Sequence, residues 1–366
     1  MEKEIKKIVL TGGPCAGKTT ALSWIQNYFE KKGYKILFVS ECATELINSG
    51  IKPWEANNSV AFQTLLMKHQ KAKEDLAVES TNFIEGDKFL IVCDRGLFDN
   101  KAYITEEEFK QVLENNNENI ESARSRYDAV FHLVTAALGA EENYNLGNKA
   151  RTEDVETARA LDSKTLNAWI GHPHLRVIDN STDFEEKMKR LMREISGVLE
   201  EPYTYEIERK FLIEMPNLAY LESLPNCEKV SIVQTYLRSD GRYEKRIRQR
   251  GRDGAYTYTL TVKYNINDIK RIEIERRLTE KEYLNELTNA DPNMAQIIKT
   301  RYCLCYNNQY FEIDIYPTND NQAILEIELN DELANVDIPD YLSVLKEVTD
   351  DPNYRNFNLA KKLVKR

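Results

Sequence analysis

One glycine-rich octapeptide near the N-terminus constrains the fold of this chain more than any other feature. Residues 12–19 read GGPCAGKT and fit the pattern G-x-x-x-x-G-K-[ST]. The apolar residues 8–10 precede them as a candidate buried strand, and a helical pattern follows over residues 20–29. Strand, glycine-rich turn and helix in this order predict a phosphate-binding loop (P-loop).

The residue types of this loop suit the phosphates of a nucleotide. Glycines allow a tight turn, so that successive N–H groups and the new helix N-terminus point at the β-phosphate. Lys18 is expected to span the β and γ oxygens, and Thr19 to hold Mg²⁺. The flanking strand and helix disfavour the alternative, a glycine-rich turn without a ligand. The predicted nucleotide-binding residues are Gly12, Gly13, Pro14, Cys15, Ala16, Gly17, Lys18, Thr19 and Thr20.

Length and composition indicate a multidomain cytoplasmic protein. At 366 residues the chain is too long for one hydrophobic core, and typical domain sizes predict two or three domains. No run of about 18 apolar residues is present, and residues 1–7 are too charged to begin a signal peptide. The six cysteines show no Cys-x-x-Cys spacing, so they indicate neither a zinc site nor a disulfide framework.

Bulk charge argues against a nucleic-acid partner. The net charge is −10, and acidic residues are in excess in both halves of the chain. Basic residues nevertheless cluster at positions 242–252, a run that is typical either of a solvated face or of an RNA-binding patch. We expect no nucleic acid among the partners.

The first half of the chain alternates strand and helix patterns. This order predicts an α/β domain over residues 1–198 with a doubly wound, mainly parallel sheet, followed by a linker at residues 196–204. The further expected strands are residues 34–40, 88–93, 130–134 and 175–178, and the further expected helices are residues 54–78, 154–170 and 184–199.

Asp94 directly follows the apolar strand at residues 89–93. An acid at the C-terminal end of a core strand is where a P-loop fold places a second Mg²⁺ contact, usually through water. An acidic cap on the next segment is the alternative. Glu41 ends the preceding strand in the same way and is a candidate for meeting a nucleophile or second substrate. Arg95, Arg151 and Arg159 are candidates for closing on the γ-phosphate, or are ordinary surface ion pairs.

Four segments of the first half resemble a known family. GGPCAGKTT, DRGLFDNKAY, RYDAVFHLVTAA and ARALDSKTLNAWIGHPHLRVIDN are similar to the AAA-type P-loop family related to ribosylnicotinamide kinases, over about residues 5–195. The resemblance implies that this half binds ATP or GTP with Mg²⁺. It leaves open whether the phosphoryl acceptor is water or a small molecule.

The second half changes to a period of two. Eight segments alternate polar and apolar residues and are separated by Asp, Gly and Asn, which predicts an α+β domain with an eight-stranded antiparallel barrel or sandwich. The expected strands are residues 205–212, 231–238, 243–250, 256–263, 270–277, 298–306, 310–316 and 323–329.

The polar faces of these strands carry charges of both signs. One interpretation is a sandwich with a salt-bridged outer surface. The other is a polar lumen, with the opposite apolar faces packed under flanking helices. Clustered carboxylates suit Mg²⁺ or Mn²⁺ and Arg or Lys suit phosphate oxygens, so such a lumen fits a metal–polyphosphate complex. The same-face groups are Glu206, Glu208 and Lys210; Arg246 and Arg248; Thr261 and Lys263; Glu273 and Glu275; Lys299 and Arg301; Glu312 and Asp314; Glu326 and Glu328.

An ordered set of motifs in this half resembles the CYTH domains, the triphosphate tunnel metalloenzymes. The likeness covers about residues 203–364 and is carried by EIERKF, the QTYL segment, RIRQR, TLTVK, EIERR, KTRY, FEIDIY, LEIEL and the closing KEVTDD. The predicted domain is residues 203–366. The resemblance implies an eight-stranded tunnel. Its metal would be held by Glu206, Glu208, Asp314, Glu326 and Glu328, and its phosphates by Lys210, Arg246, Arg248, Lys263 and Arg301. It also implies a lysine from the closing helix, either Lys361 or Lys362.

The order of the two halves resembles the TRPL translocation defect protein family. Two functions follow as expectations: a metal-dependent phosphohydrolase acting on a nucleoside triphosphate or on an inorganic or organic triphosphate, or a nucleotide-switched module whose tunnel captures a phosphorylated ligand such as an anionic phospholipid head group. In the hydrolase, Lys18, Asp94 and the tunnel cations Lys210, Arg246, Arg248, Lys263 and Arg301 are the expected catalytic residues. No basic amphipathic helix or lipidation motif favours membrane docking.

Overall fold

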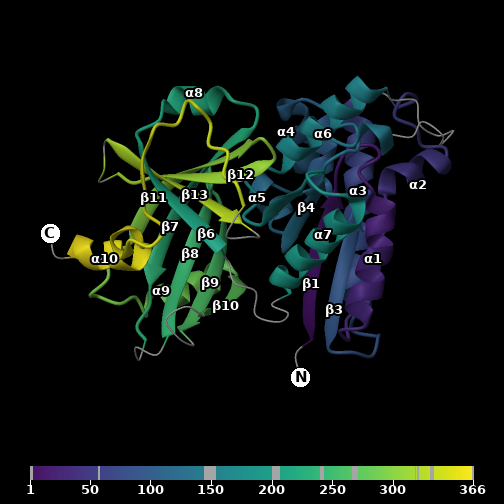
Figure 1. Ribbon diagram of the computed structural model, residues 1–366. Coiled ribbons are helices and arrows are strands. Elements are labelled where there is room, and N and C mark those ends of the chain that lie inside the picture. The colour runs from purple at the N-terminus through teal and green to yellow at the C-terminus, as the bar shows by residue number, and fades with distance from the viewer. Residues whose placement is uncertain are drawn as a thin grey trace. The chain divides into compact units, whose positions relative to one another are not determined.

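The computed structural model describes two compact units, Met1–Glu201 and Pro202–Arg366. Each has its own sheet and its own hydrophobic core (Figure 1). The described residues are 3–56, 58–143, 154–199, 207–239, 243–265, 271–317, 319, 321–329 and 334–364.

The N-terminal unit is built on a five-stranded sheet in which every pairing is parallel. The strand order β2-β3-β1-β4-β5 and the helices between the strands confirm the predicted α/β architecture. The central strands read as continuous apolar runs because both of their faces are covered. The strands are β1 (Glu4–Thr11), β2 (Lys35–Val39), β3 (Lys88–Asp94), β4 (Ala129–Leu133) and β5 (Leu175–Ile178).

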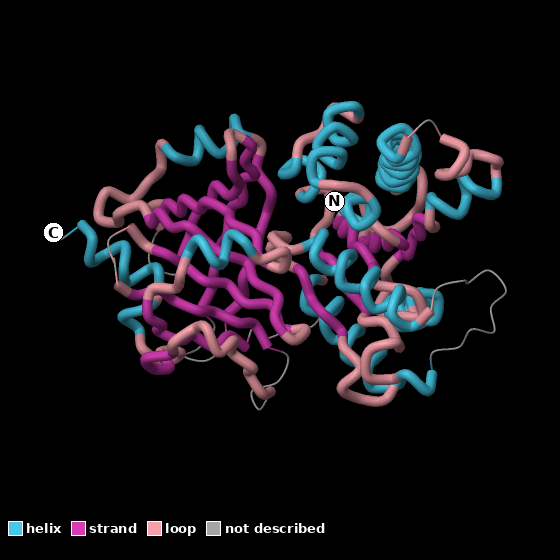
Figure 2. The backbone as a smooth tube through the Cα atoms, turned by 90° about the horizontal axis from the view of Figure 1, so that it is seen from above, coloured by secondary structure: helices cyan, strands magenta, loops and turns pink. Residues whose placement is uncertain are grey.

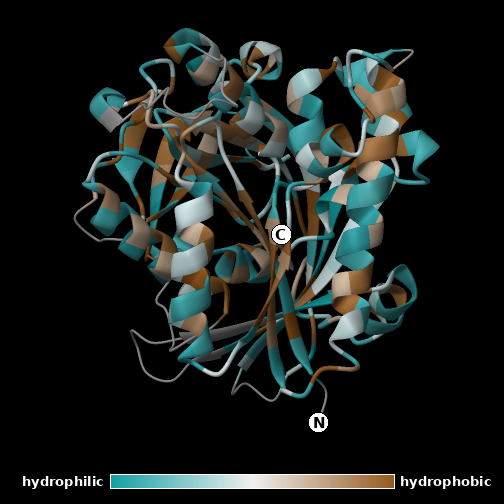
Figure 3. Cartoon of the chain, turned by 90° about the vertical axis from the view of Figure 1, so that its right-hand side faces the viewer, coloured by the Kyte–Doolittle hydropathy of each residue, from teal (hydrophilic) through white to brown (hydrophobic). Residues whose placement is uncertain are grey.

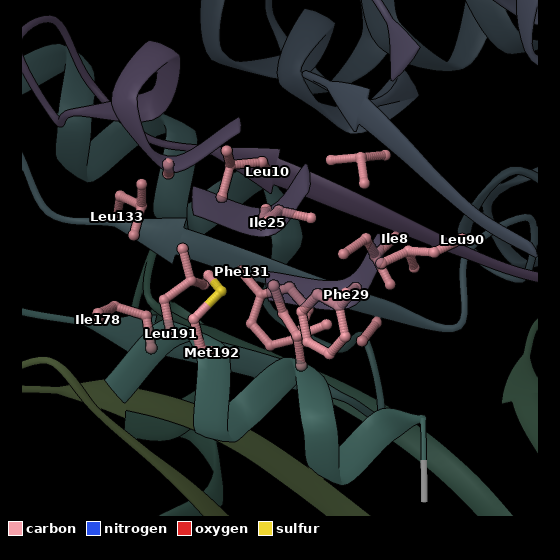
Figure 4. Close-up of a cluster of buried hydrophobic side chains, with 14 of the residues drawn as sticks. Ile8, Leu10, Ile25, Phe29, Leu90, Phe131, Leu133, Ile178, Leu191 and Met192 are labelled. Carbon is pink, nitrogen blue, oxygen red and sulfur yellow. The ribbon is translucent and has the colours of Figure 1, made fainter. Parts of the chain in front are cut away.

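Helices cover both faces of this parallel sheet. On one face, α1 (Lys18–Glu30) and α7 (Phe184–Val198) contribute Ile25, Phe29, Leu191 and Met192 to a cluster with the β-strand side chains (Figure 4). On the other face, Trp169 at the end of α6 (Val155–Trp169) packs on Gly96 and against the Phe98 ring. Hydrophilic and hydrophobic residues follow one another along the helices, as expected for helices with one buried side (Figure 3).

The helix expected at residues 54–78 begins later than predicted. In the structure, α3 spans Ser59–Ser80, because Asn58 caps it by accepting a hydrogen bond from the Ala61 N–H (2.8 Å). The other helices between β2 and β4 were not predicted. Three of them have too few turns to show a period, but the ten-residue helix at Glu106–Asn115 buries Phe109, Val112 and Leu113 at helical spacing. These unpredicted helices are α2 (Cys42–Asn48), η1 (Leu97–Tyr103), α4 (Glu106–Asn115) and α5 (Ile120–Arg124), and η2 (Glu141–Asn143) follows β4.

The C-terminal unit contains one antiparallel sheet of nine strands in the order β10-β9-β8-β7-β11-β12-β13-β6-β14. Figure 2 draws the strands in magenta. Eight of them correspond to the predicted segments. The ninth, β14, corrects the predicted strand number: its four exposed residues pair with β6 and are too few to show alternation. The strands are β6 (Ile207–Glu214), β7 (Cys227–Tyr236), β8 (Tyr243–Arg252), β9 (Ala255–Asn265), β10 (Arg271–Leu278), β11 (Ile297–Tyr306), β12 (Gln309–Ile315), β13 (Gln322–Leu329) and β14 (Val344–Glu347).

The apolar faces of these strands pack under helices. Phe211, Phe311 and Leu325 form a cluster with Leu221 of α8 (Leu218–Ser223). Ile247 and Leu278 form a second cluster with Tyr283 of α9 (Glu280–Leu287). By contrast, the last helix, α10 (Asn356–Val364), follows η3 (Pro352–Tyr354) and packs Ala360 against Tyr236 and Ile297, which share a face with Arg246 and Arg301. The charged strand faces therefore lie on the opposite side of the sheet from α8 and α9.

Within the described part of the chain, no helix combines the length and the apolar character needed to cross a membrane. All six cysteines are free thiols.

Candidate functional site

The nine predicted nucleotide-binding residues lie in the turn between β1 and α1 (residues 12–17) and in the first turn of α1 (residues 18–20). The backbone of the turn requires glycine at two positions. Gly12 has φ of 142°, and a Cβ there would lie 2.1 Å from the Leu133 carbonyl oxygen. Gly17 has φ of 89° and is the N-cap residue of α1. No described side chain caps this helix, so the N–H groups of its first turn can meet an anion.

Lys18 and Asp94 lie at the same edge of the sheet. The Lys18 Nζ is 3.4 Å from the Gly12 carbonyl oxygen, and burial together with the Arg95 charge lowers the pKa of Lys18 to about 8. Asp94 ends β3, and burial raises the pKa of its carboxyl group against the attraction of Lys18. Its Oδ1 is buried and has no hydrogen-bond partner among the described residues. An unsatisfied carboxylate oxygen of this kind fits the water shell of Mg²⁺.

Two charged residues that sequence reasoning missed hold the P-loop in place. The N–H groups of Gly13 and Thr135 both donate to Asp162 Oδ1, at 2.7 and 3.0 Å. Lys187 is buried and donates to the carbonyl oxygens of Val134 (2.8 Å) and Ala16 (3.4 Å). No short-range pattern could have indicated these residues, since both lie well over a hundred positions from the loop.

Two of the three arginines that are candidates for closing on the γ-phosphate form ion pairs and hydrogen bonds within the protein. Arg95 Nε lies 3.1 Å from Glu41 Oε1, and Arg95 Nη1 lies 3.1 Å from Asp99 Oδ1. Arg159 donates to the Ala137 carbonyl oxygen (2.6 Å) and to Glu141 (2.8 Å). Glu41 is therefore paired with Arg95. Arg151 lies outside the described residues.

In the C-terminal unit, one network of ion pairs joins charged residues from four neighbouring strands. Lys210 Nζ on β6 contacts Glu326 (2.6 Å) and Glu208 (2.9 Å). Arg301 on β11 donates from Nε to Asp314 Oδ1 (2.7 Å) and from Nη2 to Glu326 Oε2 (2.9 Å). The same network includes ion pairs from Arg301 to Glu312 and from Lys299 to Asp314.

Register explains why these side chains meet. Lys210, Glu326 and Glu312 are opposite one another on β6, β13 and β12, and Arg301 and Asp314 are opposite one another in the adjacent row. Residues directly opposite each other in a sheet share a face, so all of these groups lie on one side. The alternation predicted that Lys299 and Glu312 lie on this face, but neither residue was predicted to bind metal or phosphate.

The centre of the network, formed by Lys299, Arg301, Asp314 and Glu326, is buried, and the charges of the network shift one another's pKa values. Although burial opposes ionisation, Arg301 and Lys299 keep the pKa of Asp314 below its usual value. Lys210, Lys299 and Arg301 likewise lower the pKa of Glu326. By contrast, desolvation and the Glu326 carboxylate raise the pKa of Glu208 to about 7. The cluster thus contains ionised carboxylates next to the Glu208 carboxyl group, which is partly protonated near neutral pH.

The other predicted tunnel residues divide into three groups. Arg246 and Arg248 on β8 are opposite Tyr236 and Gln234 of β7, and Lys263 on β9 is opposite Glu244, which places all three on the charged face. Glu328 is opposite Glu208 and is exposed. Glu206 lies outside the described residues.

The two candidate lysines of the last helix are both exposed. Lys361 Nζ lies 4.1 Å from the centre of the Phe357 ring, and Lys362 donates to Asn353 Oδ1 (2.8 Å).

Comparison with known proteins identifies the first unit. A family model described as an AAA domain matches residues 7–187. The N-terminal part of the chain is therefore an AAA-like, nucleotide-binding P-loop domain, as the motif predicted. No curated protein matches the chain.

Among solved structures, the chain is similar to one described as the inorganic triphosphatase NE1496. The two are 26% identical over 43% of this chain and 95% of that chain, with a TM-score of 0.32. A second structure, described as the hypothetical protein NE1496, is 26% identical over 43% of this chain and 98% of that chain, with a TM-score of 0.31. TM-scores this low do not establish a shared fold, so the likenesses to CYTH domains and to the TRPL family stay predictions.

Proposed function

We propose that the N-terminal unit binds ATP or GTP and that the charged face of the C-terminal unit binds and hydrolyses a triphosphate with the help of a divalent metal ion. The observation that carries the second part is the largely buried network of Lys210, Arg301, Asp314 and Glu326. Burying charges of both signs costs more free energy than burying apolar side chains of similar size. Buried charges of both signs on one face therefore favour a binding site for a ligand that also carries charges of both signs.

A metal–triphosphate complex has this character. Glu208, Asp314 and Glu326 would hold Mg²⁺ or Mn²⁺ through carboxylate oxygens, together with Glu206 and Glu328 if the family resemblance holds. Bound there, the ion would supply an activated water and neutralise phosphate charge. Lys210, Arg301 and Lys299 would then exchange carboxylate partners for phosphate oxygens, and Arg246, Arg248 and Lys263 would extend the cationic surface on the same face.

Closure of the sheet is part of this proposal. Strands β10 and β14 stand at its two edges. An eight-stranded tunnel requires β10 to approach the strands at the β6 side, which would enclose the charged face and exclude water from the phosphates.

At the P-loop, the nucleotide's β and γ phosphates would meet the N–H groups of the first turn of α1 and the ammonium group of Lys18. Thr19 and Asp94 would hold Mg²⁺, with Asp94 acting through its unsatisfied oxygen. Asp162 and Lys187 would act as positioning residues because they hold the backbone of the loop. Whether the γ-phosphate goes to water or to a small molecule is left open by this arrangement.

Two measurements test the two parts: ATP or GTP binding, and phosphate release from tripolyphosphate, ATP and GTP with Mg²⁺ or Mn²⁺. Lys18→Ala should abolish ATP or GTP binding at the P-loop and leave tripolyphosphate hydrolysis intact. Glu208→Gln should lower tripolyphosphate hydrolysis by at least about a hundredfold, because metal activation of water is worth several kcal/mol.

The matched control is Glu347→Gln, which removes one negative charge from the opposite face of the same sheet, where Glu347 pairs with Arg209. It should leave hydrolysis unchanged. Tight polyphosphate binding without hydrolysis in the intact protein would instead favour a binding module. Unchanged hydrolysis in Glu208→Gln would show that the site is placed wrongly.

A further inference from the structure

Three potential metal ligands of different chemistry converge in the N-terminal unit, outside both sites described above. Cys42 and Glu45 are one turn apart on α2, so they project from the same side of that helix. His69 comes from α3. Their possible ligand atoms all lie within 4.8 Å of one another, and His69 Nε2 is 3.0 Å from Glu45 Oε2.

Packing between the two helices holds this group together. Cys42 and Leu46 of α2 form an apolar cluster with Phe62 and Leu66 of α3. His69 is one turn beyond Leu66 on α3, so it extends the same side of that helix. The thiol of Cys42 is buried at the base of the group, whereas the side chains of Glu45 and His69 are 40% and 37% exposed. A small ion can therefore reach the group from solvent.

The carboxylate of Glu45 is already oriented by neighbours. Its Oε1 accepts hydrogen bonds from Lys73 Nζ and Ser40 Oγ, both at 2.5 Å. Its Oε2 is the oxygen that faces His69. Ligating carboxylates in metal sites are commonly fixed in this way by outer partners. Binding through Oε2 leaves the contacts of Lys73 and Ser40 intact, so an ion need not displace them.

We propose that Cys42, Glu45 and His69 form a site for a borderline-soft divalent cation of the Zn²⁺ class. Zn²⁺ accepts thiolate, imidazole and carboxylate ligands together, whereas Mg²⁺ and Ca²⁺ prefer oxygen alone. Three protein ligands leave a fourth position for water. The site is therefore distinct in its chemistry from the magnesium sites of the proposed function. No local sequence pattern indicates this site, because its ligands come from two helices rather than from a Cys-x-x-Cys pair.

Titration of the intact metal-free protein with Co²⁺, a coloured substitute for Zn²⁺, tests the site. One equivalent should produce a thiolate-to-metal charge-transfer band and the intense visible bands of four-coordinate cobalt, and Zn²⁺ should abolish both. Cys42→Ser should remove the charge-transfer band. His69→Gln and Glu45→Gln should each weaken Co²⁺ affinity by at least about tenfold, since even the loss of an outer partner has an effect of that size.

Cys227→Ser is the matched control, because it removes a half-buried thiol from the C-terminal unit. It should retain the full spectrum. A charge-transfer band that survives in Cys42→Ser, or the absence of any band with the wild-type protein, would overturn the site. His69→Gln changes a partly exposed side chain, so it provides a test that does not depend on the folding of the Cys42 variant.

Discussion

Among single residues, Lys187 is a buried lysine that contacts the P-loop and whose protonation changes the free energy of unfolding. Burial lowers the pKa of its ammonium group from 10.5 to about 8. Between those two values the unfolded chain binds more protons than the folded one, so the contribution of Lys187 to stability rises with pH. Relative to Lys187→Met, the wild-type free energy of unfolding should increase by up to about 1.4 kcal/mol per pH unit above about pH 8.

Urea unfolding at several pH values measures this difference. Lys189→Met is the control on the same helix, because Lys189 is exposed and pairs with Glu185. Its stability should follow the wild type across the whole range. Parallel curves for wild type and Lys187→Met would contradict the linkage.

The residues that sequence could identify are those whose role depends on neighbours in the chain. Lys18 and Thr19 follow from one octapeptide, and Asp94 follows from the strand that precedes it. Asp162 and Lys187 act on the same loop from distant elements, and nothing in their local sequence marks them. Their function depends on which helices the parallel sheet brings to its carboxyl edge.

At the scale of elements, the antiparallel sheet places similar carboxylates in opposite surroundings on its two faces. Asp314 is fully buried and pairs with Lys299 and Arg301. Glu347 pairs with Arg209 in a half-exposed position. Asp314→Asn should lower the free energy of unfolding by about 3–5 kcal/mol, because it leaves buried cations without their partner. Glu347→Gln should cost at most about 1 kcal/mol.

Chemical unfolding of the full chain measures both values. Each substitution removes one negative charge, so a general charge effect would shift the two variants equally. If Asp314→Asn lowers the free energy of unfolding by less than about 1 kcal/mol, the prediction is wrong. The attraction in the ion pairs of Asp314 would then be no larger than the cost of desolvating the charges.

Elements with an apolar or alternating pattern were predictable, and short exposed ones were not. The alternation in β6 to β13 and the apolar residues of β1 to β5 mark these strands in the sequence. By contrast, β14 has four residues, and its pairing with β6 follows from tertiary contact alone. The same holds for α2, whose packing on α3 brings Cys42 near His69.

For the whole molecule, the proposed function predicts that two ligands act together on stability. Without ligand, the carboxylates and cations of the charged face satisfy one another. Tripolyphosphate alone would leave the carboxylates facing added negative charge, and Mg²⁺ alone would leave the cations facing added positive charge. Each ligand therefore relieves the repulsion that the other creates, so the pair should stabilise the fold more than the sum of the two separate effects.

The Lys18→Ala protein is the right background for this test, because its P-loop should no longer contribute polyphosphate binding. With the complex at about a hundred times its Kd, mass action predicts about 2.7 kcal/mol of stabilisation, read as a rise in Tm. Mg²⁺ or tripolyphosphate added alone should raise the Tm by much less. Arg246→Ala should reduce the joint effect without unfolding the sheet, because it removes a cation from the same face while leaving the ion pairs of Lys210 and Arg301 in place. Tm shifts that merely add would show that metal and phosphates do not share this site.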